Sequence, residues 1–383
     1  MLNYTMPKQI GNHNKYQILT LLRERGPASR AALSRLLGIS PVAVSRNTAQ
    51  LLHKGIIREC KAENSEMGRK PVPVELCADF CYVLGADMVG GTIKAALANL
   101  MGEIINYREE PVLVDRGAQA AMEQLISVLN ATINTAGINR EKVRILTVGT
   151  PGIFNAETGK SSFSFFLDTW DDINIRDNIS LNLRIKTIIE NDVNLDIIGE
   201  NWKGVGKDHD NIFYLKLGQG LAARFVFQKN LLRGEHNMAG EIGLMLPHLP
   251  GGNTHNYEQM LCNAAVSQKY RECGGKNRVQ TISDVSVLSA QGDETAETVM
   301  LFLLDQLAVV MLNSITVADP QVIILGGDAC SFTENHIRLL KNRIEKYFPP
   351  VQNIIPSALG GKAGVYGAIK AGLDYIEELI TDV

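Results

Sequence analysis

The stretch that decides the fold is LGADMVGGTIKAAL, residues 84–97. An apolar run that ends at Asp87 precedes two glycines and a threonine, and a second apolar run follows, so the pattern predicts two strands joined by a glycine loop. Glycine loops after a strand often bind phosphate, because the backbone amides can approach the anion. The stretch therefore predicts the start of an α/β domain and raises the question of whether its loop holds a phosphate.

Alternating strand and helix patterns continue to the end of the chain. A helical pattern covers about residues 117–136, and IKTIIEND, residues 185–192, ends on polar residues at the edge where open α/β sheets bind ligands. A second half begins near residue 196. Its strand-like runs are NIFYLKLGQG (211–220), LAARFVF (221–227) and QVIILGGD (321–328), with helices expected at about 295–317 and 334–347 and a closing helix. Two α/β halves with a cleft between them fit this order.

The charges are divided between the two ends of the chain. Residues 1–76 carry 12 Lys and Arg against 5 Asp and Glu, whereas the remainder carries 26 against 36. A basic segment before an acidic body favours a small module that binds a polyanion.

The basic segment has the pattern of a winged helix-turn-helix. KYQILTLLRERG, residues 15–26, has the apolar spacing of a helix, and Ser29 is placed to cap a second one. Gly38 supplies a tight turn, and Ser40-Pro41 supplies the cap and first residue of a third helix. IIRECK (56–61) and KPVPVEL (70–76) then predict two short strands.

The third helix is expected to present exposed side chains to the major groove of DNA, while basic residues bind phosphates and an extended arm enters a minor groove. The predicted DNA contacts are Arg30, Ser40, Val42, Ala43, Ser45, Arg46, Asn47, Lys54, Arg69 and Lys70. Two alternatives stay open: a winged helix that binds a protein partner, and Arg69 and Lys70 as solvated charges at a domain joint.

Composition excludes several other classes of protein. The chain has 383 residues with 45% hydrophobic side chains, which is enough for two or three domains. Its six cysteines form no CxxC pair and are interpreted as reduced thiols. It contains no uninterrupted apolar run near the roughly 20 residues of a membrane helix and does not begin like a secretory signal, so a cytoplasmic protein is expected.

Six motifs together resemble the ROK family of repressors, open reading frames and sugar kinases. They are LGADMVGGT, VGTPGIFNAETGK, IENDVNLDIIGENWKGVG, YLKLGQGLAA, LLRGEHNMAGEIG and ADPQVIILGGD, in this order. The winged head followed by GRKPV is similar to the repressor branch, which includes xylose and N-acetylglucosamine regulators. The resemblance implies an actin-like two-lobed fold, a sugar in the cleft between the lobes, and a homodimer or homotetramer.

The resemblance also implies the residues of a sugar site. Asp192 matches the position of the catalytic base, and the matched sugar contacts are Asn191, Asp192, His236, Glu241 and Glu258. Their chemistry suits a polyol, whose hydroxyls both donate and accept hydrogen bonds. Structural roles remain as alternatives: Asp192 as a helix cap and Glu241 as a solvated charge.

Both phosphate loops depart from the family pattern. The family's D-x-G-G-T has one residue between the aspartate and the glycines, whereas Met88 and Val89 both intervene here. The second loop, G-T-G-I-G in kinases, has become GQGLA, with Gln219 for the threonine and Ala222 for the last glycine. These changes predict that ATP does not bind and that no phosphate is transferred.

The family's zinc ligands are also replaced. Leu244 stands at the histidine position, and Leu249, Gly251 and Asn256 stand at the three cysteine positions. His248 and His255 alone are a poor metal site, so no metal is predicted. Phe166 replaces an asparagine expected before a tryptophan, which affects which sugar would bind.

The predicted protein is an N-terminal winged helix-turn-helix followed by an α/β, two-lobed, actin-like (ROK sugar-kinase-like) ATPase fold. The expected domains are 1–76, a first lobe over 77–195 on which a C-terminal helix (365–383) packs, and a second lobe over 196–364. The favoured function is a sugar-responsive transcriptional regulator that binds operator DNA, with a repressor favoured over an activator. Its kinase-like domain is expected to have lost catalysis. A kinase that also binds DNA and a scaffold that has lost its ligand are the alternatives.

Overall fold

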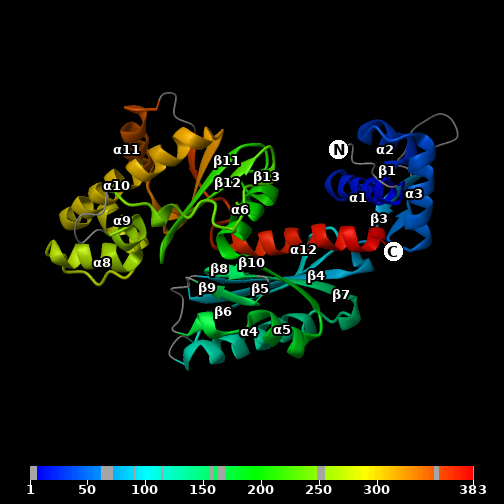
Figure 1. The fold of residues 1–383 in the computed structure, drawn as a ribbon, viewed down its shortest axis with the longest axis horizontal. Coiled ribbons are helices and arrows are strands. Elements are labelled where there is room, and N and C mark those ends of the chain that lie inside the picture. The colour runs from blue at the N-terminus through cyan, green and yellow to red at the C-terminus, as the bar shows by residue number, and fades with distance from the viewer. Residues whose placement is uncertain are drawn as a thin grey trace.

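The computed structural model describes residues 7–61, 72–89, 91–113, 116–155, 158–162, 169–247, 255–348 and 353–382. The chain forms a helical head and a body of two α/β lobes, with the C-terminal helix lying between the head and the first lobe (Figure 1). The first and the last helix are neighbours, and the C-terminal part of α1 contacts α12.

The head is a winged helix-turn-helix, as the sequence predicts. It contains α1 (Pro7–Arg25), α2 (Arg30–Leu37) and α3 (Pro41–His53), together with a sheet in the order β1 (Ala28–Ser29), β3 (Pro73–Leu76), β2 (Ile57–Glu59). The Ser29 and Ser40 side chains accept hydrogen bonds from the amides of Ala32 and Ala43, which starts α2 and α3. Gly38 ends α2 with φ of 66°, a conformation that suits glycine.

The first lobe is built on a five-stranded mixed sheet with the order β10-β7-β4-β5-β6. The strands are β4 (Tyr82–Val89), β5 (Thr92–Asn99), β6 (Ile104–Pro111), β7 (Val143–Thr150) and β10 (Lys186–Asn191). Helices α4 (Gly117–Asn134) and α5 (Ile175–Leu183) cover one face, and α12 (Ala363–Asp382) covers the other (Figure 1). A small hairpin of β8 (Ile153–Asn155) and β9 (Lys160–Ser162) follows β7.

The second lobe has its own five-stranded sheet, in the order β13-β12-β11-β14-β15. The strands are β11 (Ile212–Leu217), β12 (Leu221–Phe227), β13 (Asn230–Leu231), β14 (Val322–Gly327) and β15 (Asn353–Pro356). The helices are α7 (Tyr257–Leu261), α8 (Asn263–Glu272), α9 (Ile282–Ala290), α10 (Glu294–Ala318) and α11 (Glu334–Glu345).

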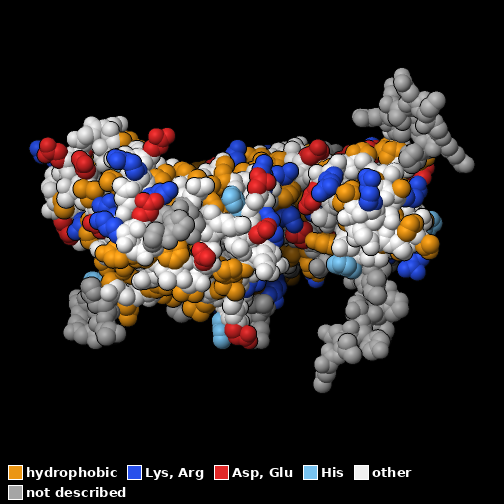
Figure 2. Space-filling model, turned by 90° about the horizontal axis from the view of Figure 1, so that it is seen from above, with side chains coloured by type: hydrophobic (Ala, Val, Ile, Leu, Met, Phe, Trp, Pro, Cys, Tyr) orange, Lys and Arg blue, Asp and Glu red, His pale blue; other side chains and the backbone are white. Residues whose placement is uncertain are grey.

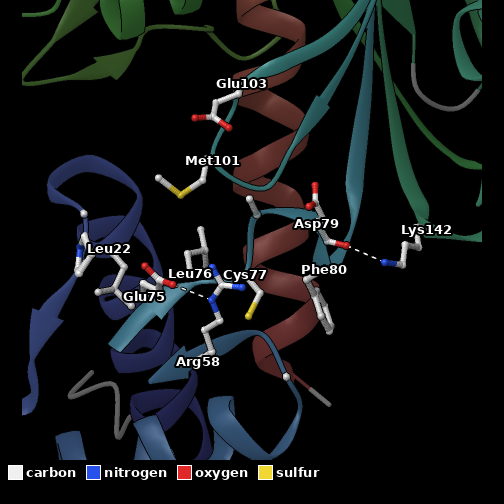
Figure 3. A pocket seen from close by; sticks show the side chains of 14 residues that line it. Leu22, Arg58, Glu75, Leu76, Cys77, Asp79, Phe80, Met101, Glu103 and Lys142 are labelled. Atoms are coloured by element: carbon white, nitrogen blue, oxygen red, sulfur yellow. Dashed lines mark hydrogen bonds and ion pairs between the residues drawn. The ribbon is translucent and has the colours of Figure 1, made fainter. Parts of the chain in front are cut away.

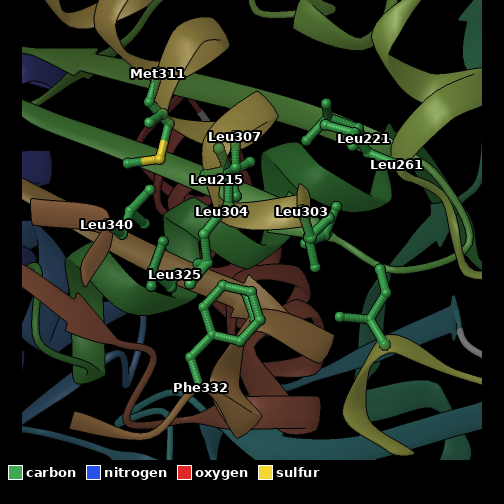
Figure 4. Close-up of a cluster of buried hydrophobic side chains, with 14 of the residues drawn as sticks. Leu215, Leu221, Leu261, Leu303, Leu304, Leu307, Met311, Leu325, Phe332 and Leu340 are labelled. Atoms are coloured by element: carbon green, nitrogen blue, oxygen red, sulfur yellow. The ribbon is translucent and has the colours of Figure 1, made fainter. Parts of the chain in front are cut away.

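Helix α10 is long and apolar enough to cross a membrane by length and composition alone. Its leucines instead pack against the sheet of the second lobe, where Leu303 and Leu307 contact the cluster that contains Leu215, Leu325 and Phe332 (Figure 4). The structure therefore explains the hydropathy of α10 by burial within this lobe.

Two helices cross where the lobes meet. Helix α6 (Asp192–Lys203) runs from the end of β10 toward the second lobe and packs on α12. A Cβ on Gly367 would lie 1.8 Å from the carbonyl oxygen of Leu195, and one on Gly199 would lie 2.2 Å from that of Ala363. The crossing is therefore close enough to require glycine, and the boundary expected between residues 195 and 196 falls inside a continuous helix.

The head is attached to α12 through a buried ion pair. Arg23 of α1 donates to Glu377 at 2.6 Å, and the Thr20 hydroxyl donates to the other oxygen of the same carboxylate at 3.0 Å. Burial raises the pKa of Glu377 to about 7, although Arg23 and Thr20 act in the opposite direction. Desolvation is therefore the larger effect on this carboxyl group.

Two open pockets lie beside this joint. One, of about 680 Å³, is lined by Leu22 and the Arg58–Glu75 ion pair of the head and by Met101 and Lys142 of the first lobe (Figure 3). The other, of about 1090 Å³, lies between the head, α6 and the β12–β13 hairpin. Lys and Arg side chains gather there beside Asp and Glu, where the head meets the body (Figure 2).

Candidate ligand site and nucleic-acid interface

The first glycine loop is a tight turn. Strands β4 and β5 pair as far as Val89 with Thr92, so Met88 and Val89 continue the strand instead of opening a loop. Gly91 has φ of 74°, as expected in a two-residue hairpin turn, while Gly90 lies outside the described residues. The additional residue seen in the sequence thus lies in the paired strand and not in the turn.

Asp87 lies two residue pairs before this turn, opposite Lys94, and is 3% exposed. Burial raises its pKa to about 8, helped by Asp196 and opposed by Lys216. Its Oδ1 atom has no hydrogen-bond partner in the part of the chain that the structure describes. Gly149 and Gly364 leave room for the carboxyl group, since a Cβ on either would lie within 2.7 Å of one of its oxygens.

Asp192, which the resemblance matches to the kinase base, forms an ion pair with a lysine. Lys216 Nζ lies 2.9 Å from Asp192 Oδ2 and 2.6 Å from Asp196 Oδ2, and these carboxylates raise the pKa of Lys216 above its usual value. The prediction from sequence did not include Lys216, although it is a single cation within the apolar strand IFYLKL. Asp192 is thus part of a buried cluster that also contains Asp87, Asp196 and Lys216.

Asn191 and Glu241, two of the predicted sugar contacts, meet at one guanidinium group. Arg224 Nη2 donates to Asn191 Oδ1 at 2.9 Å and to Glu241 Oε1 at 2.7 Å. Asn191 also caps α6 by accepting from the amides of Val193 and Asn194. Arg224 was not predicted either; its signal is a cation inside the strand LAARFVF.

Glu258 lies against the second glycine loop. Its Oε2 accepts from the amide of Leu221 at 3.1 Å, and a Cβ on Gly220 would lie 2.7 Å from the same atom. Burial raises the pKa of Glu258, and the neighbouring Glu241 raises it further. The Glu258 carboxylate therefore already accepts from one backbone amide of the loop that the sequence matches to the second phosphate motif.

His236 does not join these residues. It is exposed in the segment before Glu241 and makes no hydrogen bond to the described residues. The structure thus brings together Asn191, Glu241 and Glu258, with Asp192 next to Asn191 as the first residue of α6, and leaves His236 outside.

The replaced zinc positions have other roles where they are described. Asn256 caps α7 and exchanges hydrogen bonds with Gln259, while Leu244 and His255 are exposed. Leu249, Gly251, His248 and Phe166 lie outside the described residues. No group of three metal-ligating side chains occurs among the residues that are described.

The α3 helix presents a partly exposed face. Val42 is 80% exposed, Ser45 and Arg46 are exposed beside it, and Ala43 is half-buried. Ser40 is exposed, but its hydroxyl caps the helix. These positions leave Val42, Ser45 and Arg46 free to meet a groove of DNA.

The expectation that Asn47 is exposed is wrong. Its side chain is 0% exposed, because it follows Val44 by three residues and shares the inward face with Thr48 and Leu51. Asn47 is therefore a core residue of the head rather than a base-reading one.

The two predicted phosphate contacts, Arg30 and Lys54, are described by the structure, whereas the predicted minor-groove arm is not. Arg30 is half-buried and pairs with Glu59 at 2.9 Å, and Lys54 is half-buried at the end of α3. Arg69 and Lys70 lie outside the described residues.

Comparisons with known proteins give a family match for the head and another for the body. A ROK family model matches residues 83–372, and a winged helix-turn-helix DNA-binding model matches residues 12–58. A xylose repressor of Caldicellulosiruptor bescii is 23% identical over 362 residues, covering 90% of each chain. A glucokinase of Halalkalibacterium halodurans is 26% identical over 312 residues, covering 76% of this chain and 94% of its own.

A similar fold is seen in the crystal structure of a ROK family transcriptional regulator that is a homologue of the E. coli MLC protein. The TM-score is 0.82 at 20% identity, and the match covers 97% of this chain and 99% of the other. The expected fold class, a winged helix-turn-helix followed by a two-lobed ROK domain, is therefore confirmed. The family match spans most of the chain, and the protein belongs to the ROK family.

Proposed function

We propose that the protein is a sugar-responsive transcriptional repressor. The observation that carries the proposal is the position of α12. Glu377, near one end of this helix, contacts the head, and Gly364, near the other end, lies against the buried Asp87. A helix that touches both parts offers a path from a ligand between the lobes to a DNA-binding head. Relatives that include xylose repressors support the same function.

The proposed regulation is a two-state equilibrium. Sugar binding in the cleft changes the closure of the lobes and hence the position of two heads in a cytoplasmic homodimer or homotetramer bound to a pseudo-palindromic operator. A ligand can shift this equilibrium only by its differential affinity for the two states. The residues proposed to contact it are Asn191, Asp192, Glu241 and Glu258, with His236 available only after a movement of its segment.

Loss of catalysis is part of the proposal. The turn at Gly91 is tight, Glu258 binds the amide of Leu221, and the Asp192 carboxylate is already paired with Lys216 at 2.9 Å. A second candidate, an active sugar kinase that also binds DNA, is supported by glucokinases among the relatives and by Asp192 at the base position. Neither zinc nor ATP is proposed as a cofactor.

Two measurements separate these candidates. Operator fragments selected from random DNA should bind the full chain, and one sugar of a panel should lower that affinity. Purified protein with ATP, magnesium and the same sugars should form no sugar phosphate. Product formation at ordinary kinase rates would favour the second candidate, and failure to select any DNA would remove the first.

A further inference from the structure

A groove of about 1090 Å³ lies between the head and the second lobe. It is lined by α6 and α12, by the end of α1 and by the hairpin of β12 and β13 (Figure 1). The volume is at the upper end of the range for small-molecule sites, which is about 300–1,000 Å³. A ligand in this groove would touch the head and the body at once, because Arg23 and Glu24 of the head belong to the lining.

The cationic side chains of the lining divide into two groups. Arg23, Arg233 and Lys370 form the first group, and each lies 2.5 to 2.6 Å from a carboxylate oxygen of a neighbouring residue. These three charges are already balanced by the protein, so they add little attraction for a further anion.

The second group consists of Lys203, Lys207 and Lys229, which lie at the end of α6 and in the second lobe. Lys203 and Lys207 are exposed and form no ion pair with the residues that the structure describes. Lys229 Nζ donates to the Lys207 carbonyl at 2.7 Å, while its nearest carboxylate, that of Asp210, is 3.8 Å away and 63% exposed. Positive charge is therefore left uncompensated at this end of the groove.

The chemistry of these side chains favours phosphate over carboxylate as the anion. The planar guanidinium of arginine pairs with a carboxylate through two parallel hydrogen bonds, whereas the compact ammonium of lysine binds as a point charge. Both arginines of the described lining are already paired, so ammonium groups remain for a ligand. A phosphate ester carries about −1.5 to −2 charges at pH 7 and three strong acceptor oxygens, which several ammonium groups can share.

The rest of the lining suits the carbon part of a ligand. Ile198, Leu231 and Ala371 are half-buried apolar side chains of the groove. Glu24, on the head, is exposed and forms no hydrogen bond to the described residues, so its carboxylate can accept from ligand hydroxyl groups. The groove therefore offers cations at the second lobe, an apolar surface, and an acceptor at the head.

We propose that this groove is a second effector site and that it takes a small organic phosphate, with the phosphate on Lys203, Lys207 and Lys229 and the remainder directed toward the head. It is separate from the candidate sugar site, because Asp192 is the first and Lys203 the last residue of α6, about 16 Å apart. A ligand that touches the head and the second lobe has different affinities for different positions of the head. By linkage, its binding changes the affinity for operator DNA.

Calorimetry with the full chain tests the site. The probes are fructose 1,6-bisphosphate, ribose 5-phosphate and AMP, each compared with its unphosphorylated parent and with inorganic phosphate. At least one of the three esters should bind, and both its parent and inorganic phosphate should bind at least about tenfold more weakly. Binding should weaken as the salt concentration rises from about 0.05 M to about 0.5 M, because exposed charges are screened.

Lys203→Gln combined with Lys207→Gln removes the two unpaired ammonium groups. This double variant should bind the ester about tenfold more weakly, since two exposed charge pairs of up to about fivefold each are lost. Lys207→Gln alone should show part of the same effect and serves if the double variant is unstable.

The matched control is Lys269→Gln combined with Lys341→Gln, which removes the same charge from the same lobe away from the groove. Lys269 lies over the ring of Phe302, as Lys203 lies over that of Trp202, and Lys341 is paired on the surface of α11. This control should leave binding of the ester unchanged. In a gel-shift assay, the ester should alter operator affinity of the wild type and of the control but not of the Lys203–Lys207 variant.

Three results would overturn the inference. None of the three esters binds; or the Lys203–Lys207 variant binds the ester as tightly as the wild type; or inorganic phosphate binds as tightly as the ester. Binding that leaves operator affinity unchanged would remove the role as an effector site. Failure to select any operator would remove the proposed function, and binding measured by calorimetry does not depend on that outcome.

Discussion

Substitution of Gly367 by alanine should destabilise the body at the crossing of α6 and α12. The added Cβ would lie 1.8 Å from the carbonyl oxygen of Leu195, 2.6 Å from its carbonyl carbon and 2.9 Å from its Cα. All three are backbone atoms of α6, so no side chain can turn aside and one helix has to move. Overpacking of this kind typically costs about 1–3 kcal/mol.

A matched control exists on the same helix. A Cβ on Gly372 would meet side-chain atoms of Ile145, Thr147 and Val83 at 3.2, 3.3 and 3.4 Å, which requires only a small adjustment. Replacing a helical glycine by alanine gains up to about 1 kcal/mol in helix propensity. Gly372→Ala is therefore expected to be near neutral, whereas Gly367→Ala should lose about 2 kcal/mol despite the same gain.

The assay is urea unfolding followed by circular dichroism and by tryptophan fluorescence, with melting temperature as a second measure. Trp202 lies on α6 and is a probe of the crossing. Equal unfolding midpoints for Gly367→Ala and Gly372→Ala would refute the reasoning, because they would mean that the helices separate at no cost. A normal midpoint together with a lost sugar response would show instead that the crossing matters for coupling alone.

Three further predictions concern the head, its joint with α12 and the ligand site. Arg46→Ala should weaken specific operator binding in a gel-shift assay without changing the melting temperature. Asn47→Ala should leave the operator affinity of the folded protein unchanged, because the Asn47 side chain is buried; weaker binding at an unchanged melting temperature would contradict that burial. The pKa of Glu377 is raised from its usual value of 4.5 to about 7 in the folded protein. Between these two pH values the folded state therefore binds more protons than the unfolded state. The contribution of Glu377 to the free energy of unfolding is full below pH 4.5 and falls as the pH rises to 7. The urea midpoint should therefore fall less between pH 5 and pH 8 in Glu377→Gln than in the wild type, and parallel curves would contradict the raised pKa. Asp192→Asn, which removes one anionic partner of Lys216, should abolish the sugar response in an operator-release assay and leave operator affinity intact; a normal response would exclude Asp192 from the site.

Local sequence signals were sufficient to predict the helices and the turn of the head. The caps at Ser29 and Ser40 and the turn at Gly38 depend on residues within four positions, so their chemistry can be identified in a single sequence. The wrong expectation that Asn47 is exposed also had a local cause. The i, i+3, i+4, i+7 spacing of a buried stripe is present at Val44, Asn47, Thr48 and Leu51. Because the side chain of Asn47 is polar, the sequence did not indicate that Asn47 belongs to this buried stripe.

The ligand site depended on contacts that no local pattern contains. Arg224 joins residues 30 and 33 positions before it with one 17 positions after it, and Lys216 joins carboxylates that lie on α6. A single cation in an apolar strand indicates a buried polar contact but does not identify the partner. The motifs placed Asn191 and Glu241 in one site, but only the fold shows that a side chain of the protein already occupies the space between them.

The same geometry explains how a change in that site can reach the head. Helix α12 has 20 residues, and the step of 13 residues from Gly364, beside Asp87, to Glu377, which pairs with Arg23, covers about 20 Å with one rigid element. Because α6 is interlocked with α12 through Gly199 and Gly367, a shift of Asn191 at the start of α6 cannot be absorbed at the crossing by side-chain rotation. The shift must therefore move α12 or open the crossing, and a movement of α12 displaces Glu377, the residue that holds Arg23 of the head.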